Sequence, residues 1–330
     1  MDAKQNALEI IRFGRPERVV SGMPTHGIAY CGCNHEGYTG GGHHLPVGSA
    51  WTDIWGVGWE LEHEGVMGFP REHPLADLPD ALPTFAWPEP DDERICGPIQ
   101  PRAAAWVPES TFLCGSHRDT LWEKSYMLVG MADLMCYLHT DPAAVRDLLH
   151  GIMDFQLGIA RHYLAAGVEM VNMSDDLGTQ CGLLLSPETI HEFFVPEYRR
   201  LFGLYREHGV LVNFHSCGHI EPLLDLFVDL GVSILNPVQA SANDLQYVRA
   251  KTQGRLALLG GVSSGLLMDG TPARIRHEVR RQLWGLGRDG GYLCAPDQSM
   301  PFPPENRAAF QAALADFGTY PIQPFEESPE

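Results

Sequence analysis

Short apolar runs alternate with longer stretches of helical periodicity over most of the chain beyond residue 102. Apolar runs of about 4–8 residues are typical of buried strands, and apolar residues spaced three and four apart are typical of helices. The pattern predicts strands at 18–23, 103–107, 168–173, 210–214, 232–235, 256–259 and 291–294. It predicts helices at 6–13, 121–138, 142–166, 188–208, 220–230, 243–252, 271–286 and 305–317.

Strands that alternate with helices predict a parallel sheet, because each parallel connection needs a crossover that returns the chain. An eighth strand is expected within 45–62, where 51–59 is the most strand-like portion. Eight such units over 330 residues favour an α/β fold with a single (β/α)₈ TIM barrel domain over 1–330. We expect the irregular segment 25–101 to be an insertion that lies over the barrel mouth as a lid. A dinucleotide-binding fold has no support, since no G-x-G-x-x-G motif joins a predicted strand to a helix.

Charge and apolar content exclude several classes of protein. The chain has 23 Lys and Arg against 42 Asp and Glu, a formal net charge of −19. Such a surface disfavours nucleic acids and anionic membranes, because phosphate contacts need cations. No run approaches the ~18 apolar residues of a membrane span, and the first residues lack a signal-peptide core. We therefore expect a cytoplasmic enzyme with a small-molecule substrate and eight reduced cysteines.

Candidate chemistry follows the predicted strand ends, where (β/α)₈ barrels carry their catalytic groups. His215 and Cys217 follow the strand 210–214, and Cys294 ends the strand 291–294. One imidazole and two thiolates suit zinc, and three protein ligands leave the fourth position of a catalytic zinc open. The alternative is that both cysteines are buried barrel thiols and His215 is a hydrogen-bonded side chain.

Asp175 and Asp176 follow the strand 168–173 and are candidate catalytic residues. Adjacent residues of an extended chain point in opposite directions, so we expect one of them to face the site. That carboxylate would orient the substrate, accept a thiol proton or reach the metal. Alternatively, one aspartate caps the following turn and the other is solvated. Glu169, inside the strand, is either a further functional residue or an ion-paired barrel residue.

Two stretches, 213–224 and 231–239, resemble the uroporphyrinogen decarboxylase superfamily. The resemblance is closest to its zinc methyltransferase branch, which includes methylcobalamin:coenzyme M methyltransferases. The His-x-Cys…Cys zinc motif of that branch corresponds to His215, Cys217 and Cys294. Further similar stretches lie at 174–180, 186–188, 258–262 and 290–292. The arginine-rich amino-terminal signature of the porphyrinogen decarboxylases is absent, which argues against uroporphyrinogen as the substrate.

The resemblance implies a zinc-dependent methyltransferase. A methyl group would move between a corrinoid, free or on a small corrinoid protein, and a thiol or another small acceptor. The reverse direction, demethylation of a small compound onto the corrinoid, fits the same residues. Two other hypotheses are a metal-independent decarboxylase of a tetrapyrrole-like acid, with Arg102 and Arg118 as anion contacts, and a non-catalytic corrinoid-binding barrel.

The segment 25–75 carries histidines, cysteines and tryptophans that the resemblance does not explain. Its histidines are at 26, 35, 43, 44, 63 and 73. A substrate lid or a partner-docking loop is the favoured interpretation, with the glycines at 40–42 supplying mobility. A second metal site within 31–35 and simple packing of the tryptophans over the barrel mouth are the alternatives.

Overall fold

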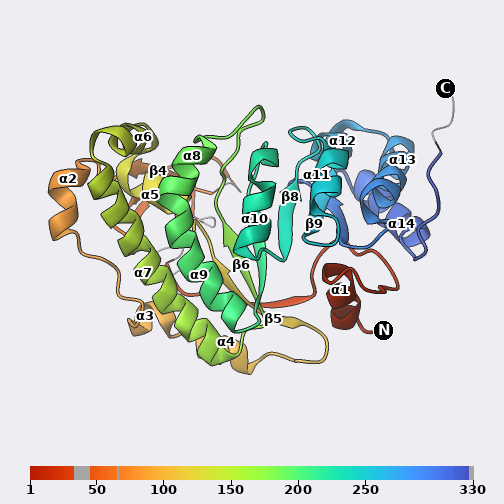
Figure 1. The fold of residues 1–330 in the computed structure, drawn as a ribbon, viewed down its shortest axis with the longest axis horizontal. Helices are drawn as coiled ribbons and strands as arrows, with labels where there is room; N and C mark the ends of the chain where they lie inside the picture. The colour runs from red at the N-terminus through yellow and green to blue at the C-terminus, as the bar shows by residue number, and fades with distance from the viewer. Residues whose placement is uncertain (33–44, 65–66, 327–330) are drawn as a thin grey trace.

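A curled sheet of parallel strands forms the centre of the molecule (Figure 1). The computed structural model describes residues 1–32, 45–64 and 67–326. The seven strands of the sheet are, in spatial order, β1 (Thr25–Ile28), β5 (Phe112–His117), β6 (Met170–Ser174), β7 (Leu211–His215), β8 (Ile234–Val238), β9 (Ala257–Val262) and β10 (Tyr292–Pro296). The predicted α/β class with a barrel-type parallel sheet is confirmed.

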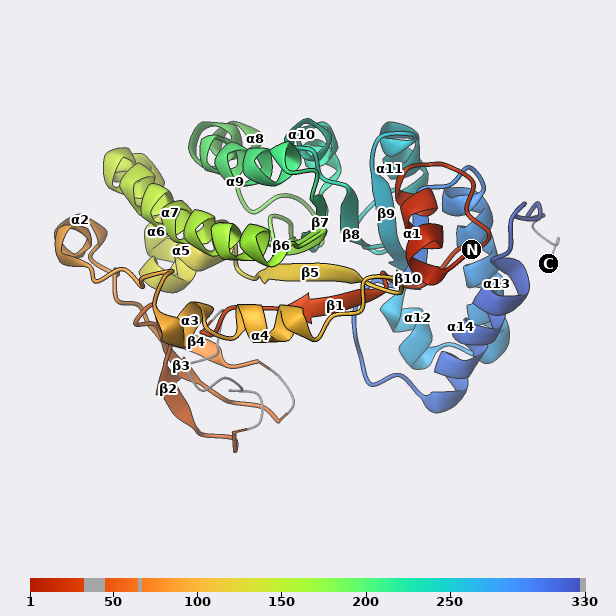
Figure 2. The same ribbon diagram turned by 90° about the horizontal axis from the view of Figure 1, so that it is seen from below.

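Helices cover the outer face of this sheet (Figures 1 and 2). The longer helices are α1 (Ala3–Ile11), α5 (Trp122–Val129), α6 (Met131–Thr140), α7 (Pro142–Ala166), α9 (Val195–Glu207), α10 (Leu224–Leu230), α11 (Leu245–Thr252), α13 (Pro272–Gln282) and α14 (Pro304–Phe317). Shorter helical segments are α2 (Leu78–Ala81), η2 (Leu82–Thr84), α3 (Glu93–Cys96), α4 (Ile99–Ala104), α8 (Pro187–Thr189), η3 (Ile190–Phe194), η4 (Glu221–Leu223), α12 (Ser264–Asp269) and η5 (Leu283–Gly287).

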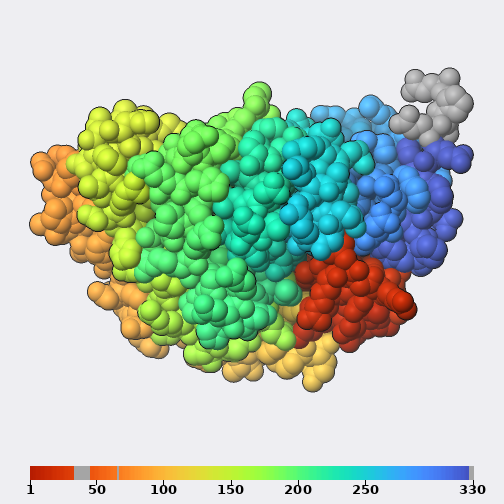
Figure 3. All heavy atoms as spheres, in the orientation of Figure 1, coloured from red at the N-terminus to blue at the C-terminus, as the bar shows by residue number. Residues whose placement is uncertain are grey.

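The curl brings the two edges of the sheet together. The backbone N–H of Cys294 in β10 donates to the carbonyl of Val20, 2.9 Å away, and Val20 lies just before β1. The terminal segments also meet, because Val19 N–H donates to the carbonyl of Gly318 at 2.8 Å. Figure 3 shows the amino-terminal segment seated against the carboxyl-terminal helices. The described sheet is therefore a half-barrel of seven strands whose edges are joined by the chain that leads into β1.

The eighth strand expected within 45–62 belongs to a second, antiparallel sheet (Figure 2). Its strands are β2 (Ala50–Thr52), β3 (Gly58–Glu60) and β4 (Phe69–Glu72). Asp53 explains the difference, since its Oδ1 accepts the backbone N–H groups of Trp55 at 2.8 Å and Val57 at 3.0 Å. These bonds close a tight turn, so the stretch doubles back as a hairpin and does not extend along the barrel.

Two predicted strands are misplaced. The run 103–107 lies in α4 and the turn after it, and the strand is β5, nearly all of it buried. Alanines favour a helix, and Val107 is 57 % exposed, so this run has no buried face to pair. The strand predicted at 18–23 begins only at Thr25. The long helix at 142–166 is correct: Asp141 caps it, Pro142 begins it, and Gly167 ends it with a φ of 81°.

The core has two parts that leave one end of the sheet open. A large apolar cluster fills the space between the sheet and the helices. A smaller cluster fills the inside of the curl at the amino ends of the strands, where Ala7 and Ile10 of α1 pack against Phe112, Met170 and Leu293. The carboxyl ends are free for a site. In the described part of the chain, no helix is long and apolar enough to cross a bilayer.

Candidate active site

A cavity of about 410 Å³ opens at the carboxyl ends of the strands. Its lining is mostly polar and, apart from Met67 just before β4, comes from β5, β6, β7, β8 and the segments after them. The lining residues are Met67, Ser116, His117, Arg118, Asp119, Glu123, Asn172, Met173, Ser174, Asp176, Asn213, His215 and Asn236. The sequence predicts a site at this edge of the sheet, and the cavity lies at the same edge.

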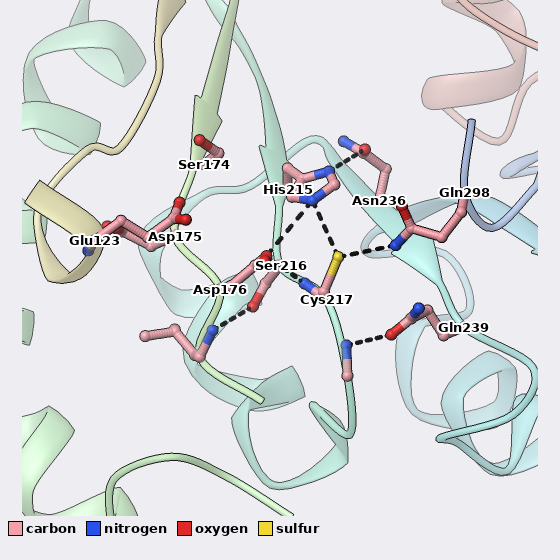
Figure 4. A network of polar contacts seen from close by, with 12 residues as sticks. Glu123, Ser174, Asp175, Asp176, His215, Ser216, Cys217, Asn236, Gln239 and Gln298 are labelled. Carbon is pink, nitrogen blue, oxygen red and sulfur yellow. Dashed lines mark hydrogen bonds and ion pairs between the residues drawn. The ribbon is translucent and has the colours of Figure 1, made fainter. Parts of the chain in front are cut away.

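Three potential metal ligands converge at the cavity (Figure 4). The Sγ of Cys217 lies 3.2 Å from His215 Nε2, and Asp176 Oδ1 lies 3.5 Å from the same nitrogen. One ligand atom from each of Asp176, His215 and Cys217 lies within 4.8 Å of the other two. A carboxylate oxygen, an imidazole nitrogen and a thiol sulfur together form a donor set that suits zinc.

Strand register and one tight turn bring these residues together. Ser174 of β6 pairs with His215 of β7, so the residues beyond both strand ends lie side by side. Asp176 then accepts the backbone N–H of Cys217 at 2.8 Å. Gly218 follows with a φ of 84°, and a Cβ there would lie 2.5 Å from the backbone of Gly178. Only glycine allows this close approach of the two loops.

Cys294 does not converge with His215 and Cys217, so the predicted three-residue ligand set is wrong at this position. β10 extends to Pro296, and Cys294 lies on the same face of it as Tyr292, which packs on η5. Its side chain is fully buried in the cluster between sheet and helices, and burial raises the pKa of its thiol to about 12. The prediction ended the strand two residues early and so placed a core residue at the rim.

Gln298 lies where the third ligand was expected. Its Nε2 donates to Cys217 Sγ at 3.1 Å (Figure 4). Its backbone N–H donates to Ser264 Oγ at 2.7 Å, which holds the segment after β10 against α12. Gln298 is not among the predicted site residues, because an amide is not a zinc-type ligand. The signal available was its place directly after the last strand.

The two adjacent aspartates have different environments. Asp175 is fully buried and accepts the N–H groups of Leu121 and Glu123, each at 2.9 Å, and the Tyr198 hydroxyl at 2.7 Å. Burial raises the pKa of Asp175 to about 7 despite these donors. Asp175 therefore binds the start of α5, a helix that precedes it in the chain, and ties it to α9, whereas the capping alternative placed its bonds in the turn that follows. Asp176 lines the cavity and is not simply solvated, because it accepts the Cys217 N–H.

Burial also shifts the pKa values of two side chains at the site. It raises the pKa of the Cys217 thiol to about 12, with a further contribution from the charge of Asp176. Burial and the nearby carboxylates, Asp119 first, raise the pKa of Glu123 well above its usual value. In the absence of a cation, the Cys217 thiol holds its proton at neutral pH. Glu123 was missed in the sequence because it lies on a helix that packs beside the strand ends.

Other predicted residues have mixed outcomes. Arg118 lines the cavity, whereas Arg102 lies on α4 and is outside the described lining. Glu169 forms an ion pair with Lys4 at 2.7 Å, which agrees with the ion-paired interpretation.

The insertion 25–75 contributes Met67 to the cavity wall. Trp55 and Trp59 are buried, as the packing alternative expected. Most of the predicted second metal site within 31–35 lies outside the described residues, as do the glycines at 40–42 and the histidines at 43 and 44.

Comparison with known proteins identifies the family. Residues 122–317 match the family model "Uroporphyrinogen decarboxylase (URO-D)", so the chain belongs to this family, as its sequence predicted. Among solved structures, a methyltransferase from Methanosarcina mazei has a TM-score of 0.69 at 16 % identity, over 96 % of this chain and 99 % of that chain.

A B12-independent methionine synthase from Shewanella sp. W3-18-1 has a TM-score of 0.43 at 10 % identity, over 78 % of this chain and 68 % of that chain. This likeness is too distant to support a conclusion. No curated protein matches the sequence. The family and a fold shared with a methyltransferase are therefore established.

Proposed function

We propose that the chain is a zinc-dependent methyltransferase that moves a methyl group between a corrinoid and a thiol or another small molecule. The convergence of Asp176, His215 and Cys217 at the cavity carries this proposal. The fold shared with a methyltransferase supports the reaction class. The corrinoid, free or on a small corrinoid protein, is proposed from the resemblance at 213–224 and 231–239.

The residues of the cavity fit zinc chemically. Asp176, His215 and Cys217 would hold the ion through O, N and S atoms, and three protein ligands are typical of catalytic zinc sites that also accept a substrate atom. When bound, zinc lowers the pKa of a coordinated substrate thiol, so that a thiolate nucleophile is present at neutral pH. A cation at this point also offsets the burial that keeps the Cys217 thiol protonated.

The remaining side chains position the reactants and hold protons. Asp176 fixes the backbone of Cys217, and the Gln298 amide donates to the Cys217 sulfur. Glu123 faces the cavity with a raised pKa and is placed to exchange a proton with the substrate. A cavity of about 410 Å³ suits a small acceptor or donor, so the much larger corrinoid must approach at the mouth.

In such a transfer, a sulfur–methyl bond would form as the methyl–corrinoid bond breaks, and the electron pair of the broken bond would stay on the corrinoid as the leaving group. Such an in-line displacement depends mainly on holding the reacting atoms in position. The opposite direction, demethylation of a small compound, uses the same arrangement.

Metal content and turnover distinguish this function from the two alternatives. The purified full-length chain is expected to hold about one zinc and to transfer the methyl group of methylcobalamin to members of a thiol panel, followed by the change in corrinoid absorbance. An active protein without bound metal would favour the decarboxylase. Zinc and corrinoid binding without turnover towards any thiol or methylated donor would favour the non-catalytic barrel.

A further inference from the structure

Three asparagines form a ladder across neighbouring strands of the cavity wall. Asn172 of β6 lies in register with Asn213 of β7, and Asn236 of β8 lies in register with His215. Asn236 Nδ2 donates to Asn213 Oδ1 at 2.7 Å, and Asn213 Nδ2 donates to Asn172 Oδ1 at 2.9 Å. The other end of the ladder is the contact of Asn236 Oδ1 with His215 Nδ1, at 3.1 Å (Figure 4).

The direction of the Asn236 amide is fixed by the backbone. Its Nδ2 also lies 3.4 Å from the carbonyl oxygen of Phe214, a group that can only accept a hydrogen bond. The amide nitrogen must therefore face Phe214 and Asn213, and the amide oxygen must face the imidazole. An oxygen acceptor at Nδ1 requires that this nitrogen carry a proton, because a neutral imidazole has one donor and one acceptor.

We propose that Asn236 is a positioning residue that holds His215 in the Nδ1–H tautomer and leaves the Nε2 lone pair aimed at Cys217 and Asp176. This inference deepens the proposed function, and its consequence for zinc rests on that function. Metal-binding histidines generally donate their other ring N–H to such a partner, which fixes ring orientation and ligand basicity.

The groups around Nε2 offer a competing arrangement. Asp176 Oδ1, 3.5 Å from Nε2, would favour a proton on that nitrogen. The same oxygen already accepts the Cys217 N–H at the shorter distance of 2.8 Å. The Cys217 thiol lies 3.2 Å from Nε2 and can donate its proton there. The hydrogen bonds then run in one direction from Gln298 through Cys217, His215 and Asn236.

Nuclear magnetic resonance of the metal-free full-length chain, labelled with ¹⁵N-histidine, tests the tautomer directly. Long-range ¹H–¹⁵N correlations separate a protonated ring nitrogen from an unprotonated one, and the spectrum of His215→Gln identifies the His215 signals. We expect a protonated Nδ1 and an unprotonated Nε2. Asn236→Leu should move the proton to Nε2, whereas the matched variant Asn236→Asp, which keeps an acceptor, should retain the Nδ1–H form.

Zinc affinity gives the second measurement, with zinc ion as the probe. Asn236→Leu should weaken zinc binding about 10–100-fold, the usual effect of removing such a partner, and Asn236→Asp should retain most of the affinity. A wild-type protein with its proton on Nε2 would overturn the proposal, as would a Leu variant with unchanged tautomer. If Asn236→Leu does not fold, the wild-type and Asp spectra still decide.

Failure of the proposed function gives a different result. A wild-type chain that binds no zinc and transfers no methyl group, but has the Nδ1–H tautomer, would contradict the function and leave the tautomer lock intact.

Discussion

The two cysteines of the predicted zinc motif have different environments, and substitution separates their roles. Cys217→Ala removes one of three converging ligands, so zinc content should fall from about one per chain to near zero while the chain stays folded. Cys294→Ala changes a buried core position and should keep its zinc. Metal analysis of the folded fractions, monitored by circular dichroism, makes the comparison. If Cys294→Ala lost its zinc and Cys217→Ala kept it, Cys294 and not Cys217 would be the zinc ligand.

The proton of Cys217 makes zinc binding depend on pH. Burial raises the pKa of this thiol to about 12, so it is protonated across the neutral range and must lose its proton to bind metal. Affinity should therefore rise with pH, by about tenfold per pH unit for one released proton. Calorimetric titration with zinc in buffers of different ionisation enthalpy counts the protons. A pH-independent affinity between pH 6 and about 8 would contradict thiolate ligation.

At the scale of elements, Asp175 joins two helices to the rim of the sheet. Its carboxylate accepts two N–H groups at the start of α5 and the hydroxyl of Tyr198 on α9. Asp175→Ala should lower the free energy of unfolding by about 2 kcal/mol, since a helix cap and a buried hydrogen bond are lost together. Urea denaturation measures the change. The conservative variant Asp175→Asn should lose less, and equal stability of the Ala variant would contradict the capping role.

Sequence patterns located most elements because their ends carry local signals. The Asp141–Pro142 start and the Gly167 end of α7 are such signals, and the predicted bounds are correct. The end of a strand is harder to predict, because apolar and polar residues continue to alternate beyond the last hydrogen bond of the ladder. Because β10 extends to Pro296, Cys294 lies in the core and Gln298 lies at the rim. No local sequence pattern indicates this strand end. By contrast, the proximity of His215 and Cys217 at the rim follows from a local signal, because Gly218 ends their segment.

At the scale of the whole molecule, the insertion could not be predicted as a sheet of its own. The hairpin of β2 and β3 depends on the side chain of Asp53, which also accepts the Trp59 indole N–H at 2.9 Å. Lys124 of α5 lies over the ring of Trp55 with its Nζ 5.3 Å from the ring centroid. The Asp53 contacts are local and close the hairpin, whereas the Lys124–Trp55 contact joins the second sheet to a distant part of the chain beside the barrel. The hydrophobic pattern alone does not indicate these contacts, and without them an eighth barrel strand is the simplest prediction for this stretch.

Residues that stabilise the fold and residues of the candidate site lie at opposite ends of the sheet, as is usual in barrels. Ile10 of α1 is fully buried in the cluster that fills the amino ends of the strands, with Met170 and Leu293, while the cavity with His215 opens at the carboxyl ends. Ile10→Ala should therefore lower the free energy of unfolding by about 2–5 kcal/mol through lost burial and a cavity. Zinc content per folded chain should stay unchanged.

Ile10→Val is the matched control, because it removes a single methylene group and should cost about 0.5–1.5 kcal/mol. Urea denaturation gives the stabilities, and metal analysis of the folded protein gives the zinc content. A loss of zinc from the folded Ala variant would mean that α1 supports the site as well as the core. If stability falls in the order wild type, Val, Ala while the zinc content of all three is equal, α1 supports the core and not the site. We expect this result because the ends of β6 and β7 fix the ligands at the rim.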